Sequence, residues 1–129
     1  MSMQLGITKQ VDLSFDEAIK KVTDELQKEG FGVLTTIDVK ETIQQKLNLN
    51  FRKYTILGAC NPTFAHQALE IDDSIGLLLP CNIVIQEKSG KTEISIFNPS
   101  LITNFFQDDH FEKMSVELRG LINRVLQHL

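Results

Sequence analysis

Cysteine is scarce in this chain, with two residues among 129. Two cysteines are too few for the disulfide framework that holds many small secreted domains together. The sequence has no run of about 18 apolar residues, so it predicts no membrane-spanning helix and no membrane partner. Residues 1–15 also lack the basic start, apolar block and small-residue cleavage site of a signal peptide. We therefore expect a cytoplasmic protein with reduced thiols.

Clusters of basic residues are missing as well. The formal net charge is −4, and adjacent basic residues occur only at Lys20-Lys21 and Arg52-Lys53. Because phosphate neutralisation dominates nucleic-acid affinity, we expect no nucleic-acid partner. The motifs CxxC, GxGxxG, HExxH and the P-loop are absent. The sequence therefore assigns no catalytic residue, cofactor or resident metal, and an enzyme is not the favoured class.

The composition is that of a globular protein. Apolar residues make up 42% and charged residues 23% of the chain, and no low-complexity tract or internal repeat is present. A chain of this length buries roughly two-thirds of the surface that it exposes when unfolded. We expect one domain over residues 1–129.

The chain begins with a strand pattern followed by a helix pattern. Alternating apolar residues predict a half-buried strand over residues 3–11, although Lys9 breaks the apolar set. Ser14 and Glu17 have the spacing of a capping box, in which each side chain satisfies an amide of the other residue. Gly30 predicts the end of this helix.

Two faces of this first helix can be distinguished. One is an apolar stripe formed by Phe15, Ala18, Ile19, Val22 and Leu26. The other carries Glu17–Lys21 and Asp24–Lys28, acid-first pairs four residues apart that we expect to form ion pairs.

A second strand and a short helix come next. Residues 31–39 alternate like a strand, and Asp38 with Glu41 predicts a short capped helix after it. From Phe51 the chain returns to a strand pattern that ends at Cys60.

Residues 54–86 hold both cysteines and the most apolar run of the chain. Asn61 is a good helix N-cap, and Pro62 suits the first helical position because its missing amide would be unpaired there. The apolar run predicts a long strand over residues 75–86. Pro80 interrupts it, because proline cannot donate to a strand ladder.

Ser89-Gly90 predicts a two-residue hairpin loop between this strand and the strand of residues 87–97. The loop sets three facing pairs: Ile85 with Ile94, Ile83 with Ile96, and Cys81 with Asn98. A final helix is predicted over residues 109–128, and Gly120 within it predicts close packing.

The elements follow the order β-α-β-(α)-β-α-β-β-α. Only the last two strands are joined by an evident tight hairpin. This order predicts an α+β single domain, with an antiparallel sheet of at least four strands covered mainly on one side by helices. The helices of residues 14–29 and 109–128 should both pack on that sheet, because their apolar stripes are too wide to leave in water.

The segments ILGACNPTFAHQAL and IGLLLPCNIVIQE resemble the domain of unknown function 302 family. That family has a Gly-x-Cys-Asn-Pro turn, an Ala/Leu-bearing helix and a Leu-Leu-Pro-Cys strand. The matching positions are Gly58, Cys60, Asn61, Pro62, Ala65, Ala68, Leu69, Leu77, Leu78, Leu79, Pro80 and Cys81. The stretch KKVTDELQKEGFGVLTTIDVKETIQQKL and the terminal helix are similar too, so the resemblance covers nearly the whole chain.

The resemblance implies a fold similar to the TATA-binding protein, with a curved antiparallel sheet and helices packed on it. It implies no activity, because fold does not carry function. Where the family pattern has Asp-Pro after the hairpin, this chain has Asn98-Pro99, which carries no carboxylate.

The candidate site residues gather around the two cysteine motifs. They are Cys60, Asn61, Pro62, Cys81 and Asn98. Cys60 directly precedes a helix N-terminus, where amides and the helix dipole favour an anion or a thiolate. Both cysteines can equally pack as small apolar residues.

Three functional classes stay open. The first is a binding module for a small ligand or an anion at the helix start of residues 60–62. The second is a thiol site, in which Cys60 and Cys81 serve redox chemistry or a soft metal such as Cu(I). The third is a structural role as a homodimer. The strand of residues 3–11 is the expected dimer contact, since it lacks proline and carries few charges.

We also expect Cys60 and Cys81 to be neighbours across the sheet or its rim. One helix separates the two strands that carry them, and such a connection can return the chain beside its start. Cys60 should be the more reactive thiol, because the helix that begins at Pro62 stabilises its thiolate.

Overall fold

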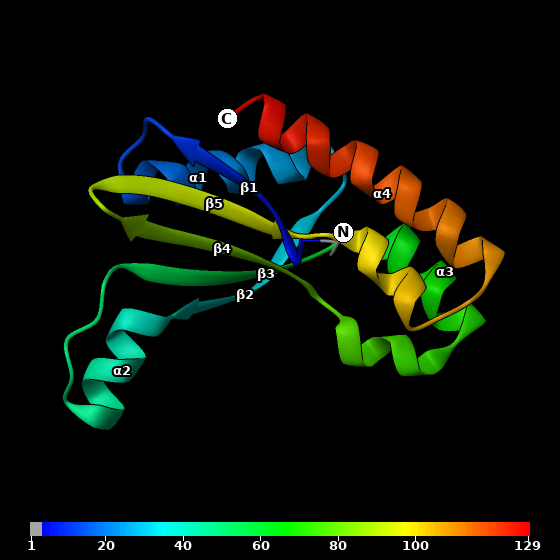
Figure 1. Cartoon of the computed structure of the whole chain (residues 1–129), viewed down its shortest axis with the longest axis horizontal. Coiled ribbons are helices and arrows are strands. Elements are labelled where there is room, and N and C mark those ends of the chain that lie inside the picture. Colours follow the sequence, from blue (N-terminus) through cyan, green and yellow to red (C-terminus); the bar gives the residue numbers. More distant parts are fainter. Residues whose placement is uncertain (1–3) are drawn as a thin grey trace.

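Five strands form one antiparallel sheet in the order β1-β5-β4-β3-β2 (Figure 1). The computed structural model of the chain describes residues 4–129. The strands are β1 (Gly6–Val11), β2 (Gly32–Asp38), β3 (Tyr54–Cys60), β4 (Cys81–Lys88) and β5 (Lys91–Phe97). The helices are α1 (Phe15–Lys28), α2 (Val39–Leu47), α3 (Pro62–Ile71) and α4 (Asp109–Gln127), with the 3₁₀ helices η1 (Asp73–Leu78) and η2 (Pro99–Asn104). The predicted α+β class is confirmed.

Strand β1 is shorter than predicted. It begins at Gly6, and Met3, the first residue of the predicted strand, lies outside the described residues. None of the helices in residues 4–129 is long and apolar enough to cross a membrane.

The predicted capping box starts α1. Ser14 Oγ accepts a hydrogen bond from the Glu17 amide at 3.2 Å, and Glu17 Oε1 accepts one from the Ser14 amide at 3.3 Å. Gly30, just beyond the helix, has φ of +85°, a conformation that glycine adopts without a Cβ clash. Both ends of α1 are therefore set by local chemistry.

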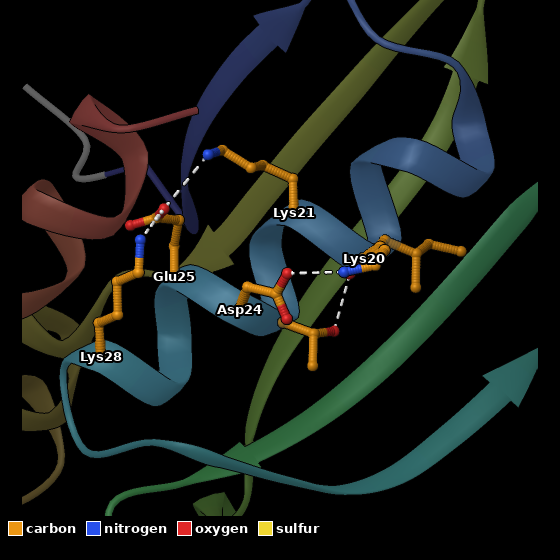
Figure 2. Close-up of polar contacts among 7 residues, drawn as sticks. Lys20, Lys21, Asp24, Glu25 and Lys28 are labelled. Atoms are coloured by element: carbon orange, nitrogen blue, oxygen red, sulfur yellow. Dashed lines mark hydrogen bonds and ion pairs between the residues drawn. The ribbon is translucent and has the colours of Figure 1, made fainter.

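The ion pairs on α1 differ from those predicted (Figure 2). Asp24 pairs with Lys20 at 3.0 Å instead of with Lys28. Glu25 pairs with Lys21 at 3.3 Å and with Lys28 at 2.8 Å. The Glu25 side chain is only 5% exposed. A carboxylate removed from water needs charged partners, and both nearby lysines turn towards it.

Residues 75–80 do not extend β4, and the predicted long strand is wrong there. They follow an Asp72 cap, whose Oδ1 accepts from the Ser74 amide at 3.0 Å, and the chain turns into η1. Strand β4 begins only after the Leu79–Pro80 peptide bond, which is cis. The cap and the proline together confine the apolar run to a short 3₁₀ helix.

The hairpin of β4 and β5 is confirmed. Ser89 and Gly90 form its loop with φ of 52° and 77°, the positive values that a two-residue hairpin turn requires. The predicted pairs Ile85–Ile94 and Ile83–Ile96 are present.

Two hydrophobic cores support the fold. The first lies between one face of the sheet and the helices α1 and α4, and its most buried members are Ala18, Val22, Leu26, Leu57, Ala59, Ile83, Ile85, Ile94, Ile122 and Val125. The second joins α3, η1 and the first half of α4, which gather at one end of the sheet in Figure 1. Its buried members are Ala68, Ile75, Phe111 and Met114. Gly120 of α4 has no neighbour within 4 Å of an added Cβ, so the predicted close packing there is wrong.

Candidate ligand-binding cavity

A half-enclosed cavity of about 50 Å³ lies where the two hydrophobic cores meet. Its walls come from the end of β3, the start of β4, α3, η1, η2 and α4. Apolar side chains dominate the lining, among them Phe31, Phe64, Ala65, Ala68, Ile75, Met114 and Leu118. Leu118 packs against both cores. The cavity is therefore a gap between two separately packed units.

Both cysteines line this cavity, and both are free thiols. Cys81 pairs with Ala59 across β3 and β4, and Cys60 follows Ala59 in the chain. Diagonal neighbours of this kind have Cα atoms roughly 6 Å apart, from a strand pair spacing of about 5 Å and a rise of about 3.4 Å per residue. That Cα separation falls in the range of about 4.4–6.8 Å that disulfides span, but successive strand residues point to opposite faces, so a bond would also require the Cys60 side chain to turn towards Cys81 at the end of β3. The two residues are neighbours at one rim of the sheet.

Cys81 is a neutral thiol at neutral pH. Burial raises the pKa of Cys81 to about 11, and the nearby Cys60 adds to the shift when it carries charge. A thiol in this state is a poor nucleophile and a poor metal ligand, since both reactions use the thiolate. The prediction that Cys60 is the more reactive of the two stays a prediction.

Asn61 and Pro62 form the start of α3. Asn61 Oδ1 accepts from the Phe64 amide at 3.5 Å, and the Asn61 carbonyl accepts from the Ala65 amide at 2.9 Å. Pro62 occupies the first turn and has no amide hydrogen. The first turn therefore leaves at most the Thr63 amide for an anion. Asn61 lines the cavity, whereas Pro62 is exposed.

Asn98 does not line the cavity. Its side chain is buried, where Oδ1 accepts from the Ser100 amide at 3.1 Å and from Arg119 at 3.4 Å. Its Nδ2 donates to the Gln4 carbonyl at 3.2 Å. The β4–β5 ladder ends two residues short of the predicted Cys81–Asn98 pair. Asn98 is a structural cap for η2 and an anchor for the N-terminal segment.

Helix α4 supplies lining residues that the sequence pattern did not single out. Phe111, Met114 and Leu118 belong to its predicted apolar stripe, which indicated burial but not a cavity. Ser115 is buried beside them, and its hydroxyl donates to the Glu112 carbonyl at 2.8 Å. Throughout the described part of the chain, every buried side-chain nitrogen and oxygen has a hydrogen-bond partner. No fully buried side-chain nitrogen or oxygen around the cavity is therefore left unpaired.

The histidines contribute nothing to this site. His66, His110 and His128 are exposed, as expected for isolated surface residues. Residues 4–129 contain no group of three or more His, Cys, Asp or Glu side chains placed to hold a metal ion.

Comparison with known proteins places this geometry in a family. The chain matches the family described as "Domain of unknown function DUF302" over residues 7–129. It is similar to a solved structure described as an uncharacterized conserved protein DUF302 from Bacillus stearothermophilus. The two chains are 28% identical, the match covers 98% of each, and the TM-score is 0.90. None of the curated proteins matches the chain.

Proposed function

Because the chain belongs to the DUF302 family, a domain of unknown function, its role has to be inferred from its own cavity, and we propose that this cavity binds a small, uncharged, largely apolar molecule. One observation carries the proposal: a half-enclosed, mainly apolar cavity lies where the two hydrophobic cores meet. Ligand sites are typically concave and lined mainly by apolar side chains.

The cavity sets limits on the ligand. Its volume of about 50 Å³ holds only a few non-hydrogen atoms. A longer ligand would therefore insert one end, and the rest of the ligand would extend out of the cavity. The mainly apolar lining favours a ligand that needs no buried hydrogen bond.

An anion is a poorer fit to the same site. Asn61 already takes one amide of the α3 start, and Pro62 removes another. The neighbouring Cys81 is neutral, and no basic side chain lines the described cavity. A negative charge would therefore lose water without gaining a partner.

A thermal-shift and calorimetric titration tests the proposal. The probes are the straight-chain alcohols from butanol to octanol, each of which can insert its apolar end. A probe at ten times its Kd adds about 1.4 kcal/mol to the free energy of unfolding. For a domain of this size that raises Tm by about 5 °C.

Two substitutions on α3 form a matched pair for this experiment. Ala65→Phe places a ring in the cavity and should abolish the shift in Tm, because Ala65 lines the wall. Leu69→Phe lies on the exposed side of the same helix and should keep the shift. If no probe raises the Tm of the unmodified protein, or if Ala65→Phe responds as strongly as Leu69→Phe, the proposal is wrong.

A thiol role is the second candidate, favoured by the closeness of Cys60 and Cys81. Oxidation by a small-molecule disulfide would remove two protons and two electrons and leave one Cys60–Cys81 bond. Cu(I) is less favoured, because the raised pKa of Cys81 opposes the thiolate that the metal needs. Free thiols placed this close agree with a reducing compartment, and we keep the cytoplasm as the proposed location.

Oxidised glutathione provides the test of this second role. The expected product has lost 2 Da through formation of one intramolecular disulfide. Cys60→Ser and Cys81→Ser should each lose this product. An unmodified protein that keeps two free thiols at equilibrium, or that forms only mixed disulfides, rules the thiol role out.

A further inference from the structure

Ala59 and Cys81 form one wall of the cavity. They are paired residues of β3 and β4, and both line the cavity. Paired residues of neighbouring strands point to the same face of a sheet. Ala59 is fully buried in the core between the sheet and the helices, so this is the helix-covered face. The strand register therefore directs the Cys81 side chain towards the cavity.

Cys60 lies beside this wall, and its backbone is held on both sides. It is the last residue of β3, where it pairs with Gly32 of β2. The next residue, Asn61, caps α3 and donates from Nδ2 to the Glu29 carbonyl at 3.4 Å. A strand ladder and a helix cap thus fix the backbone at Cys60, and a movement at this point is confined to the side chain.

Gly32 leaves room for such a movement. It is the cross-strand partner of Cys60, and a Cβ added at Gly32 would meet no atom within 4 Å. A side chain changes between staggered rotamers without moving its backbone. The Cys60 sulfur can therefore turn from the end of β3 towards Cys81, across a Cα separation of roughly 6 Å that a disulfide spans.

We propose that a disulfide between Cys60 and Cys81 closes the cavity to its ligand, so that binding depends on the redox state of the pair. Redox control of this kind rests on the apolar-ligand binding proposed above and adds its regulation. In the reduced protein, both thiols border the space that the ligand enters. In the oxidised protein, the Cys60 sulfur lies against the Cys81 sulfur and takes up part of that space.

The oxidant is a small-molecule disulfide. The Cys60 thiolate attacks one of its sulfurs, the sulfur–sulfur bond breaks, and the released thiolate takes up a proton. Cys81 then loses its proton and attacks the Cys60 sulfur of the mixed disulfide, and the second small thiol leaves. Two protons and two electrons have passed from the cysteines to the oxidant. Burial raises the pKa of Cys81 to about 11, so this thiol reacts in the second step, where its partner is already beside it.

The cavity is small enough for the position of one atom to matter. Its volume is about 50 Å³, and a single water molecule needs about 10–15 Å³. A sulfur atom that moves inside takes the place of at least one methylene group of the ligand. Each buried methylene contributes a factor of about four to affinity. Oxidation should therefore raise the Kd at least about fourfold.

Calorimetric titration of the reduced and the oxidised protein with the alcohols from butanol to octanol tests this control. Oxidised glutathione forms the disulfide, and mass spectrometry identifies the folded product that has lost two hydrogen atoms and carries no glutathione. The oxidised protein should bind at least about fourfold more weakly than the reduced protein. Dithiothreitol should restore the original Kd.

The variant that combines Cys60→Ser with Cys81→Ser is the matched control, because it cannot form the bond. Its Kd, whatever the value, should be the same before and after treatment with oxidised glutathione. Circular dichroism establishes that each species is folded. If the double variant does not fold, recovery of the Kd with dithiothreitol takes its place as the control.

The outcomes separate the redox control from the binding on which it rests. If the reduced protein binds none of the alcohols, the apolar-ligand function is wrong and the control falls with it. If the reduced and the oxidised protein bind with the same Kd, only the control is wrong. The control is also overturned if no intramolecular disulfide forms at equilibrium, if the oxidised protein is unfolded, or if the double variant responds to the oxidant equally.

Discussion

Lys9 in β1 donates a hydrogen bond from Nζ to the carbonyl oxygen of Leu126 in the last turn of α4, at 2.9 Å. The two residues are 117 positions apart in the chain. The last carbonyls of a helix have no partner within the helix, and a cation near them is favourable. Lys9 breaks the apolar alternation of its strand, and this contact is the physical reason: it joins the first strand to the last helix.

Lys9→Met removes this hydrogen bond while keeping most of the apolar stem. The free energy of unfolding should fall by about 1.5–3 kcal/mol, the range for a hydrogen bond that involves a charged group. Urea denaturation measures the change. Lys46→Met, at an exposed position of α2, is the control and should stay within about 0.5 kcal/mol of the unmodified protein. Equal effects of the two substitutions would show that the Lys9 contact adds no stability.

Gly58→Ala should destabilise the sheet. A Cβ at Gly58 would collide with Thr35 Oγ1 and would lie 2.8 Å from Cγ of Pro80. The proline ring cannot turn aside as a flexible side chain can, so we expect a loss of about 1–3 kcal/mol in the free energy of unfolding. Gly32→Ala is a matched glycine substitution in the adjacent strand, with no atom within 4 Å of the new Cβ. It should be tolerated, and a similar loss in both variants would contradict the steric argument.

Glu25 makes stability depend on pH in the acid range. Hydrogen bonds from Lys28, and then from Lys21, lower the pKa of Glu25 below 4.5, although burial opposes the shift. A lowered pKa stabilises the fold above the unfolded-state value, and this stabilisation is lost as pH falls through the folded-state value. The stability advantage over Glu25→Gln should therefore be constant near neutral pH and shrink below about pH 4.5. Urea unfolding from pH 3 to 7 tests this, and parallel curves would exclude a role for the carboxylate.

Cys81 should be slow to react in the folded protein. In Cys60→Ser, iodoacetamide should modify Cys81 far more slowly at pH 8 than a free thiol, with the rate rising towards pH 11. The substitution removes the Cys60 charge, so the pKa of Cys81 should lie somewhat below its value in the unmodified protein. The same variant in urea provides the unfolded rate. A folded rate equal to the unfolded rate would show that burial does not protect this thiol.

Duplex DNA should not bind, although one face of the sheet carries no helix in the described residues and could receive a ligand. The formal net charge is −4, and adjacent basic residues occur only at Lys20-Lys21 and Arg52-Lys53, so the sequence offers no run of basic residues to neutralise phosphates. Fluorescence anisotropy with a labelled duplex at physiological ionic strength should show no saturable, salt-sensitive increase.

Features that depend on neighbouring residues could be predicted from the sequence. The Ser14–Glu17 box, the Asn61 cap and the Ser89-Gly90 loop each follow from hydrogen bonds or dihedral angles within a few positions. The loop also fixed the hairpin register, because one turn determines every pair along two strands.

Features that depend on which surfaces meet could not be predicted. Ile75 is 1% exposed and Leu77 is 89% exposed, yet both lie in one apolar run that a strand pattern fits equally well. Cys81 pairs with Ala59 of β3, whereas the β4–β5 ladder ends at Ile83–Ile96, short of the predicted Cys81–Asn98 pair. The cavity itself arises from the meeting of two cores, and a stripe on α4 does not reveal how well its partner fills it.

Strand β1 pairs with β5, and Gly6 lies opposite Phe97. Strand β1 therefore has no partner in this sheet until β5 has been made. At about 5–20 residues per second, the wait from Val11 to Phe97 lasts on the order of 4–17 s. Over that interval β1 remains an unpaired, half-polar segment, and the sheet can be completed only after β5 has been made.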